Sequence, residues 1–170
     1  MLVPEPKIVR FRLEAEVRLD TKSAVGGIFA CHTRHVTNQG PLHAMVVAEV
    51  QRAGKDKLQP MLSPVQFVPE AAFGKWREYD TGSSKRVPRS EDGWHHLVLD
   101  VSPEAIRMTT DDAEIAVLRQ EKRAIASEKL LQGYPEIRDA AHPTFWPGGG
   151  VGLRIGHGSA SFRRVVLTPQ

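Results

Sequence analysis

The feature that most constrains the fold is a strict alternation of apolar and charged residues near the N-terminus. Over residues 9–20 every second side chain is apolar, and each side chain between them is Arg, Glu or Asp. Successive side chains of a β-strand point to opposite faces, so this period of two predicts a strand with one face on a core. We expect the apolar side chains, Leu13 among them, to be buried and the charged ones, Glu14 and Glu16 among them, to be exposed.

Short stretches of similar character recur along the chain, separated by turn residues. We expect further strands at 25–31, 42–50, 57–62, 94–101, 105–110, 114–118 and 159–168. Residues 33–41 are polar and end in Gly-Pro, which predicts a loop. Residues 63–92 are interrupted by prolines, which predicts irregular structure with one short strand at 75–80. Short strands joined by tight turns are typical of an all-β sandwich.

One segment departs from this pattern. Residues 119–133 are rich in Glu, Lys, Ala and Leu, which favour helix. Gly133 stands where helices commonly end. We therefore expect one short helix at 119–133, inserted before the last two strands, and a long loop over 134–150. Loops of that length in a compact domain are often functional.

The length and the charge distribution limit the number of domains and the kinds of partner that we expect. The 170 residues fit one domain, so we expect a single sandwich over 1–170. The 23 basic residues are interleaved with 20 acidic ones, unlike the basic patch of a nucleic-acid binder. No apolar run reaches the roughly 20 residues of a membrane-spanning helix, and the N-terminus does not resemble a signal peptide. We expect neither nucleic-acid nor membrane partners. The lone Cys31 favours a reducing compartment or a bacterial origin.

Several short motifs together resemble the bacterial 3-keto-disaccharide hydrolase-like and laminin-G-like domains of the concanavalin A-like superfamily. The matching segments are Phe11–Arg18, Gly26–Phe29, Trp94–Leu99, Ile106-Arg107, Gly152-Leu153 and Phe162-Arg163. The resemblance implies a jelly-roll sandwich of two antiparallel sheets in which the first and last strands pair. Relatives carry Asn-Gly or Asp-Gly where this chain has Asp111-Asp112-Ala113, so we expect a hairpin turn other than type I′ there. No functional residue is transferred from these families, because fold does not fix function.

The sequence contains no catalytic motif that we could identify. Retaining glycosidases need two carboxylates about 5–5.5 Å apart. Glu14 and Glu16 alternate with arginines on a predicted solvated strand face. Glu78 and Asp80 lack a third acidic partner and fit a polar strand edge. We therefore name no catalytic residue.

Metal-ligand chemistry is concentrated in one cluster, Cys31, His32, His35 and His43. Its spacing does not match a standard zinc site, and adjacent strand residues point to opposite faces. Asp111 and Asp112 alone supply too few oxygens for calcium, which takes about 6–8. We expect no metal and no cofactor. Of the adjacent His95 and His96, one should face the core.

Aromatic side chains in predicted loops and edges are the remaining candidates for ligand contacts, because loops on a rigid scaffold carry binding. The candidate ligand-binding residues are Trp76, Tyr79, His96, Tyr134 and Trp146. The alternative for the rings, Phe145 included, is that they fill the ends of the sandwich as part of the core. We interpret the chain as a non-catalytic binding module for a glycan or a protein partner. A structural domain for assembly and a glycoside-acting enzyme related to keto-disaccharide hydrolases are the alternatives.

Overall fold

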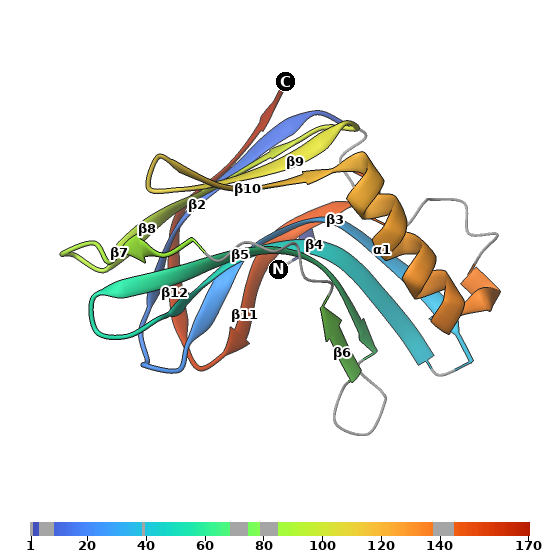
Figure 1. Cartoon of the computed structure of the whole chain (residues 1–170), viewed down its shortest axis with the longest axis horizontal. Helices are drawn as coiled ribbons and strands as arrows, with labels where there is room; N and C mark the ends of the chain where they lie inside the picture. The colour runs from blue at the N-terminus through green and yellow to red at the C-terminus, as the bar shows by residue number, and fades with distance from the viewer. Residues whose placement is uncertain (1, 4–8, 39, 69–74, 79–84, 138–144) are drawn as a thin grey trace.

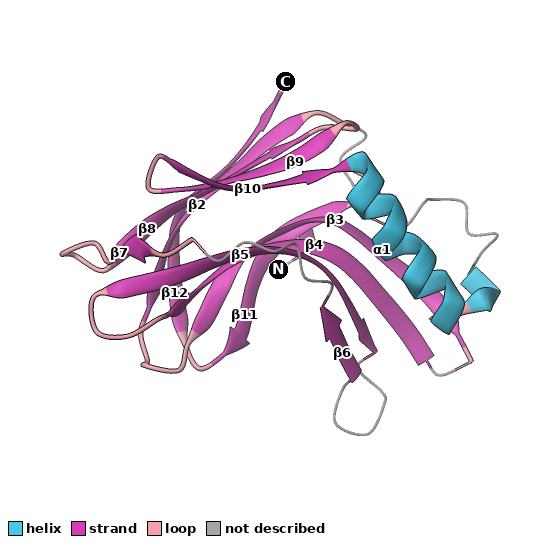
Figure 2. Cartoon of the chain, in the orientation of Figure 1, coloured by secondary structure: helices cyan, strands magenta, loops and turns pink. Residues whose placement is uncertain are grey.

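The computed structural model describes residues 2–3, 9–38, 40–68, 75–78, 85–137 and 145–170. Two antiparallel sheets pack face to face, and one helix lies beside them (Figures 1 and 2). The predicted fold class is confirmed: the protein is an all-β jelly-roll sandwich with one inserted helix.

Sheet A is the larger sheet, with seven strands in the order β1-β11-β3-β4-β5-β6 and β7 paired to β5. Its strands are β1 (Leu2–Val3), β3 (Val25–Thr37), β4 (Gly40–Arg52), β5 (Lys57–Val68), β6 (Lys75–Glu78), β7 (Val87–Pro88) and β11 (Gly150–His157). Sheet B has five strands in the order β10-β9-β8-β2-β12. They are β2 (Phe11–Leu19), β8 (Trp94–Val101), β9 (Ala105–Thr110), β10 (Ala113–Arg119) and β12 (Ala160–Pro169).

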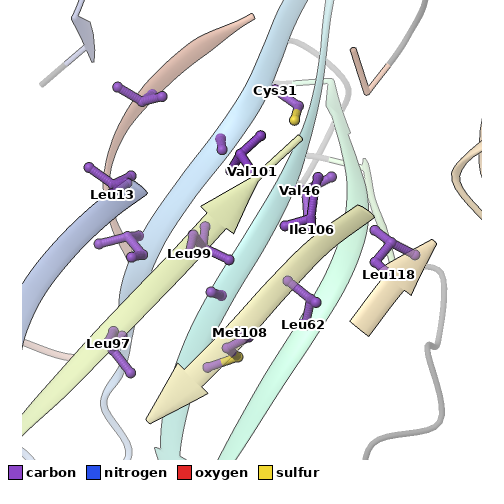
Figure 3. Packing of buried hydrophobic residues seen from close by; sticks show 14 of the residues in the cluster. Leu13, Cys31, Val46, Leu62, Leu97, Leu99, Val101, Ile106, Met108 and Leu118 are labelled. Carbon is purple, nitrogen blue, oxygen red and sulfur yellow. The ribbon is translucent and has the colours of Figure 1, made fainter. Parts of the chain in front are cut away.

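The core lies between the two sheets. Figure 3 shows Leu13 and Leu99 of sheet B in one cluster with Val46 and Leu62 of sheet A. The alternation in β2 is observed as predicted, since Leu13 is 2% exposed and its apolar strand neighbours are also buried. Glu14 and Glu16 were expected to be exposed and are instead partly buried, because side chains of the adjacent strands cover them.

The first long strand and the last strand pair, as predicted. β12 runs antiparallel to β2, with Leu167 opposite Leu13 and Arg163 opposite Glu16. Arg163 and Arg164 of β12 both contact the same carboxylate of β2, that of Glu16.

The loop predicted at 33–41 is wrong, because β3 continues to Thr37 and β4 begins at Gly40. A β-bulge lies between Ala30 and Thr33 in the pairing with β4. A bulge inserts an extra residue and re-aims the side chains that follow it. Thr33 and His35 are consequently buried, and their side chains hydrogen-bond to each other at 3.1 Å. Buried polar side chains that hydrogen-bond to each other give a strand a polar sequence, and from the sequence alone such a strand looks like a loop.

The region 63–92 is more regular than its prolines indicated. β5 continues through Pro60 and Pro64 to Val68. On the side of β5 away from β4, β7 pairs with residues 57–58 and β6 with residues 65–68. No described strand pairs with the prolines on that edge, so their missing N–H groups are tolerated.

The tight turn predicted at Asp111-Asp112 is present, but its predicted type is wrong. Thr110 pairs with Ala113, and both intervening aspartates have positive φ, 48° and 63°. Those angles define a type I′ turn. Aspartate tolerates this conformation, and here the Asp111 carboxylate accepts a hydrogen bond from the His96 backbone N–H at 2.8 Å.

The predicted helix is confirmed as α1 (Gln120–Gly133), followed by a 3-10 turn, η1 (Pro135–Ile137). Its buried side chains, Arg123, Ala126 and Leu130, are spaced to lie on one helix face. That face joins the main core, and α1 contacts both β10 and β5. The helix thus extends the layer of sheet B over sheet A. No helix in the described part of the chain is long and apolar enough to cross a membrane.

Candidate functional site

A groove lies on the face of sheet A that is turned away from sheet B, and we call it the sheet groove. It has a volume of about 550 Å³ and is lined chiefly by Phe29 of β3, Met45 of β4, Phe67 of β5 and Arg154 of β11. The strands β3, β4 and β5 are bowed, and sheet B and α1 lie on their convex side (Figure 1). The groove therefore occupies the concave face of a rigid sheet.

The floor of the sheet groove is apolar. Along β4, Val46 belongs to the main core, whereas Met45 and Val47 belong to a separate buried cluster with Phe29 and Val65. Successive strand residues point to opposite faces. β4 is therefore apolar on both faces, which explains its nearly uninterrupted apolar sequence.

A buried ion pair lies at one end of the groove. Arg154 of β11, Gly27 of β3 and Glu49 of β4 are neighbours across three strands, and Arg154 Nη1 pairs with Glu49 Oε2. The two side chains are only 15% and 7% exposed. An added Cβ at Gly27 would lie 2.1 Å from the Ala48 carbonyl oxygen, so only glycine allows β3 and β4 to approach this closely. Burial lowers the pKa of Arg154 to about 10, which leaves the guanidinium charged at neutral pH.

Two histidines meet beside the groove, next to the bulge in β3. His32 Nε2 lies 2.8 Å from His43 Nδ1, and the His32 ring makes an edge contact with Phe29. Burial, together with repulsion from His43 and His35, lowers the pKa of His32 to about 4. Burial and the charge of Arg34 also lower the pKa of His43. Both imidazoles are therefore neutral at pH 7.

The predicted ligand-binding residues do not form one site. Trp76 lies on β6 opposite Phe67, which in turn pairs with His43, so its backbone position borders the sheet groove. Tyr79 lies outside the described residues. His96 lies on sheet B, where its Nε2 is 3.0 Å from Glu14 Oε2.

The two other candidates lie near α1. Tyr134 is 6% exposed and belongs to the main core. It therefore fills the core, which was the alternative to ligand binding. Phe145 is buried in the same cluster. Trp146 is 38% exposed and lines a second cavity beside the helix. Sequence spacing could not distinguish the buried aromatic residues from the exposed one, because all of them lie outside the segments with alternating apolar residues.

The cluster predicted as the best source of metal ligands is divided between two environments. Cys31 is fully buried in the main core (Figure 3), and burial raises its thiol pKa to about 12. His35 contacts Thr33, whereas His32 contacts His43. Among the described residues, no group of three or more His, Cys, Asp or Glu side chains is placed to hold a metal ion.

The remaining acidic and histidine candidates have structural partners. His95 is 1% exposed, as predicted for one of the adjacent histidines, and its Nδ1 lies 2.6 Å from Asp111 Oδ2. Glu14 and Glu16 face His96 and the arginines of β12. Asp80, the predicted partner of Glu78, lies outside the described residues.

Sequence inspection missed Glu49 and Arg154. The available signal was a single carboxylate within the apolar stretch 42–50. A charged residue in a strand buried on both faces requires a partner of opposite charge. The partner lies more than 100 residues further along the chain, so only the sheet register identifies it.

No protein-family model matches the sequence, and no curated protein matches it either. Among solved structures, the chain is similar to the carbohydrate-binding module CBM66 from Bacillus subtilis (16% identity, TM-score 0.44, covering 94% of this chain and 75% of that one). It is also similar to sheep galectin-11 (10% identity, TM-score 0.46, covering 98% and 96%). A third match is the kappa-carrageenase from Pseudoalteromonas carrageenovora (11% identity, TM-score 0.47, covering 96% and 54%). Similarity at this level carries no information about the ligand or activity of this chain.

Proposed function

We propose that this protein is a non-catalytic binding module whose sheet groove holds a neutral saccharide. The observation that carries the proposal is the composition of the groove on its concave sheet: aromatic and apolar walls that include Arg154, with the ion-paired Glu49 and the histidine pair beside them. Ligand sites of about 300–1,000 Å³ commonly combine such walls with a small number of placed polar groups.

The charges of the groove favour a neutral ligand. Glu49 and Arg154 neutralise each other, and His32 and His43 are uncharged at pH 7. The imidazole pair still offers hydrogen-bonding nitrogens, and Phe67 offers an apolar ring. A saccharide presents matching chemistry, because it carries hydroxyl groups around apolar ring faces.

Catalysis of glycoside hydrolysis is disfavoured by the carboxylates. Glycosidases use a pair of Asp or Glu residues, about 5–9.5 Å apart, on either side of the scissile bond. Glu49 is the only acidic residue in the strands that line the groove, β3, β4, β5 and β11, and it is ion-paired with Arg154; the bordering strand β6 carries one more, Glu78. An ion-paired carboxylate has no proton to give to a leaving group.

Titration calorimetry with a panel of neutral oligosaccharides tests this proposal. We expect saturable binding of at least one sugar, and Phe67→Ala should weaken it about tenfold or more by removing a wall of the groove. Phe162→Ala is the matched control, because Phe162 is also a partly buried phenylalanine but packs against the main core. Absence of binding across the panel, or equal binding by Phe67→Ala and wild type, would show that the groove is not a saccharide site.

A further inference from the structure

A second cavity lies between α1 and the segment that begins at Phe145, and we call it the helix pocket. It has a volume of about 410 Å³, and its lining includes Arg123, Ser127, Leu131, Phe145 and Trp146. The pocket is separate from the sheet groove in its lining residues. Its size falls within the range of small-molecule sites.

Most of the pocket wall is apolar. Phe145 forms part of this wall and is 1% exposed, whereas Trp146 is 38% exposed, a large fraction for an indole. Leu131 packs partly against the main core. An exposed tryptophan beside a cavity offers a flat apolar face to a ring-shaped ligand.

Arg123 gives the pocket an unusual charge. Its side chain is 5% exposed, and its two terminal nitrogens donate to backbone carbonyl oxygens, one of Phe145 at 3.4 Å and one of Pro103. The remaining guanidinium nitrogen, Nε, is buried and has no hydrogen-bond partner.

No carboxylate of the described residues forms an ion pair with Arg123. The groups whose charge acts on it are Cys31, Glu104 and Glu121; none of them forms an ion pair with it, and Glu104 is paired with Arg10 at 2.6 Å. A cation buried without an anion is costly. An anionic ligand in the pocket would supply the missing charge, and the planar guanidinium suits a carboxylate.

We propose that the helix pocket binds a small carboxylate ligand, with the carboxylate toward Arg123 and an apolar ring face against Trp146. The class comprises ring-bearing acids, whether sugar acids or aromatic acids. Glu128 also lines the pocket and is exposed, so its charge disfavours an anion at the rim. This site is independent of the saccharide proposed for the sheet groove.

Calorimetry with matched acids and neutral analogues tests the site. We expect benzoate to bind at least about tenfold more tightly than benzamide, or D-glucuronate more tightly than D-glucose, because hydrogen bonds to a charged group are strong. Binding of the sugar acid alone or of the aromatic acid alone would identify the ligand class. Equal affinity for acid and neutral analogue in both pairs, or no saturable binding of either acid, would overturn the proposal.

Variants locate the binding. Trp146→Ala should weaken acid binding, and Glu128→Gln should strengthen it about two- to fivefold by removing an exposed like charge. Glu91→Gln, an exposed glutamate away from the pocket, is the control and should have no effect. Arg123→Met should abolish binding, but it also removes the contacts to Pro103 and Phe145, so its melting curve must be checked. Unchanged affinity in Glu128→Gln together with Trp146→Ala would rule out this pocket.

A variant of the sheet groove shows whether the acid binds in the helix pocket or in the sheet groove. Phe67→Ala should leave acid binding unchanged, since Phe67 does not line the helix pocket. Acid binding that disappears in Phe67→Ala would place the acid in the sheet groove and overturn the assignment to Arg123.

Discussion

Arg164 donates a hydrogen bond from Nη1 to Glu16 Oε1 at 2.6 Å, although the backbone of Arg164 has a φ of 51°. The register of β12 against β2 shifts between Arg163 and Val166, so this residue lies in a β-bulge. In a regular strand, adjacent arginines point to opposite faces. The bulge places both guanidinium groups on one carboxylate, and β12 is thereby joined to β2 by side chains as well as by backbone pairing.

Removal of β12 should therefore unfold the protein. A chain ending before Phe162 loses the part of β12 that pairs with residues 11–17 of β2, and it exposes apolar side chains of the core. We expect the cooperative transition in a thermal melt to be lost, as followed by circular dichroism. A truncated chain that stays monomeric and melts cooperatively near the full-length temperature would contradict this pairing.

The faces of β2 predict opposite outcomes for two neighbouring substitutions. Leu13→Ala should cost about 2–5 kcal/mol in unfolding free energy, because it leaves a cavity in the main core. Glu14→Gln lies on the outer face and should change stability by no more than about 0.5 kcal/mol. Urea denaturation of both variants measures the difference. Equal destabilisation by the two would mean that the assigned register of β2 is wrong.

The fold was predictable where the sequence carries a local periodicity. The alternation along β2 indicates a strand, and the composition of α1 indicates a helix, without reference to any other part of the chain. The continuation of β3 past His32 was not predictable, because the bulge changes which residues face inward. The type of the turn at Asp111 was mispredicted because the contacts that favour it come from His95 and His96 of β8, which do not adjoin the turn in sequence.

The candidate site was less predictable than the fold, since it depends on register. Aromatic residues could be recognised as candidates, but Tyr134 and Trp146 differ only in burial, which no local pattern reveals. Glu49 and Arg154 come from strands that are neighbours of β3 but not of each other. Gly27 lies between them in the register, and its missing side chain lets β3 approach β4 closely.

Gly27 should tolerate no side chain. In Gly27→Ala the new Cβ would lie 2.1 Å from the Ala48 carbonyl oxygen and 2.6 Å from Glu49 Cα, so β3 and β4 must separate. We expect a loss of about 1–3 kcal/mol or more, typical of overpacking. Gly133→Ala is the control: no atom lies within 4 Å of its added Cβ, and alanine at this helix end should be neutral or stabilising by up to about 1 kcal/mol. Similar chemical denaturation midpoints for the two variants would contradict the close approach at Gly27.

Breaking the Glu49–Arg154 ion pair should destabilise the protein strongly, whereas replacing both residues with apolar ones should change its stability much less. Glu49→Ala leaves Arg154 buried without its anion, and we expect a loss of about 3–5 kcal/mol. Replacement of both residues, by Glu49→Leu with Arg154→Met, should recover most of that stability, because apolar residues of similar volume avoid the desolvation of two charges. A double-mutant cycle in urea measures both effects. A double variant as unstable as Glu49→Ala would show that the pair is not an isolated unit.

Protonation of the histidine pair should destabilise the fold as the pH falls. The pKa of His32 is lowered from an ordinary value of 6.5 to about 4, mainly by burial and then by its histidine neighbours. The unfolded chain therefore binds more protons than the folded one between these values. Stability is fully present above pH 6.5 and declines as the pH falls toward 4. His35 and His43, whose pKa values are also lowered, act in the same direction.

Urea denaturation between pH 6.5 and 4.5 isolates this effect, because the carboxylates with lowered pKa, such as Glu16 with its ordinary value of 4.5, lose their stabilisation only at lower pH. We expect the unfolding free energy to fall over this interval, and His32→Gln to reduce the slope while retaining a polar partner for His43. His157→Gln, at an exposed position near the end of β11, is the matched control and should leave the slope unchanged. A wild-type stability that is flat or rising toward pH 4.5 would mean that the pair is not held neutral, and the uncharged groove inferred from it would no longer stand.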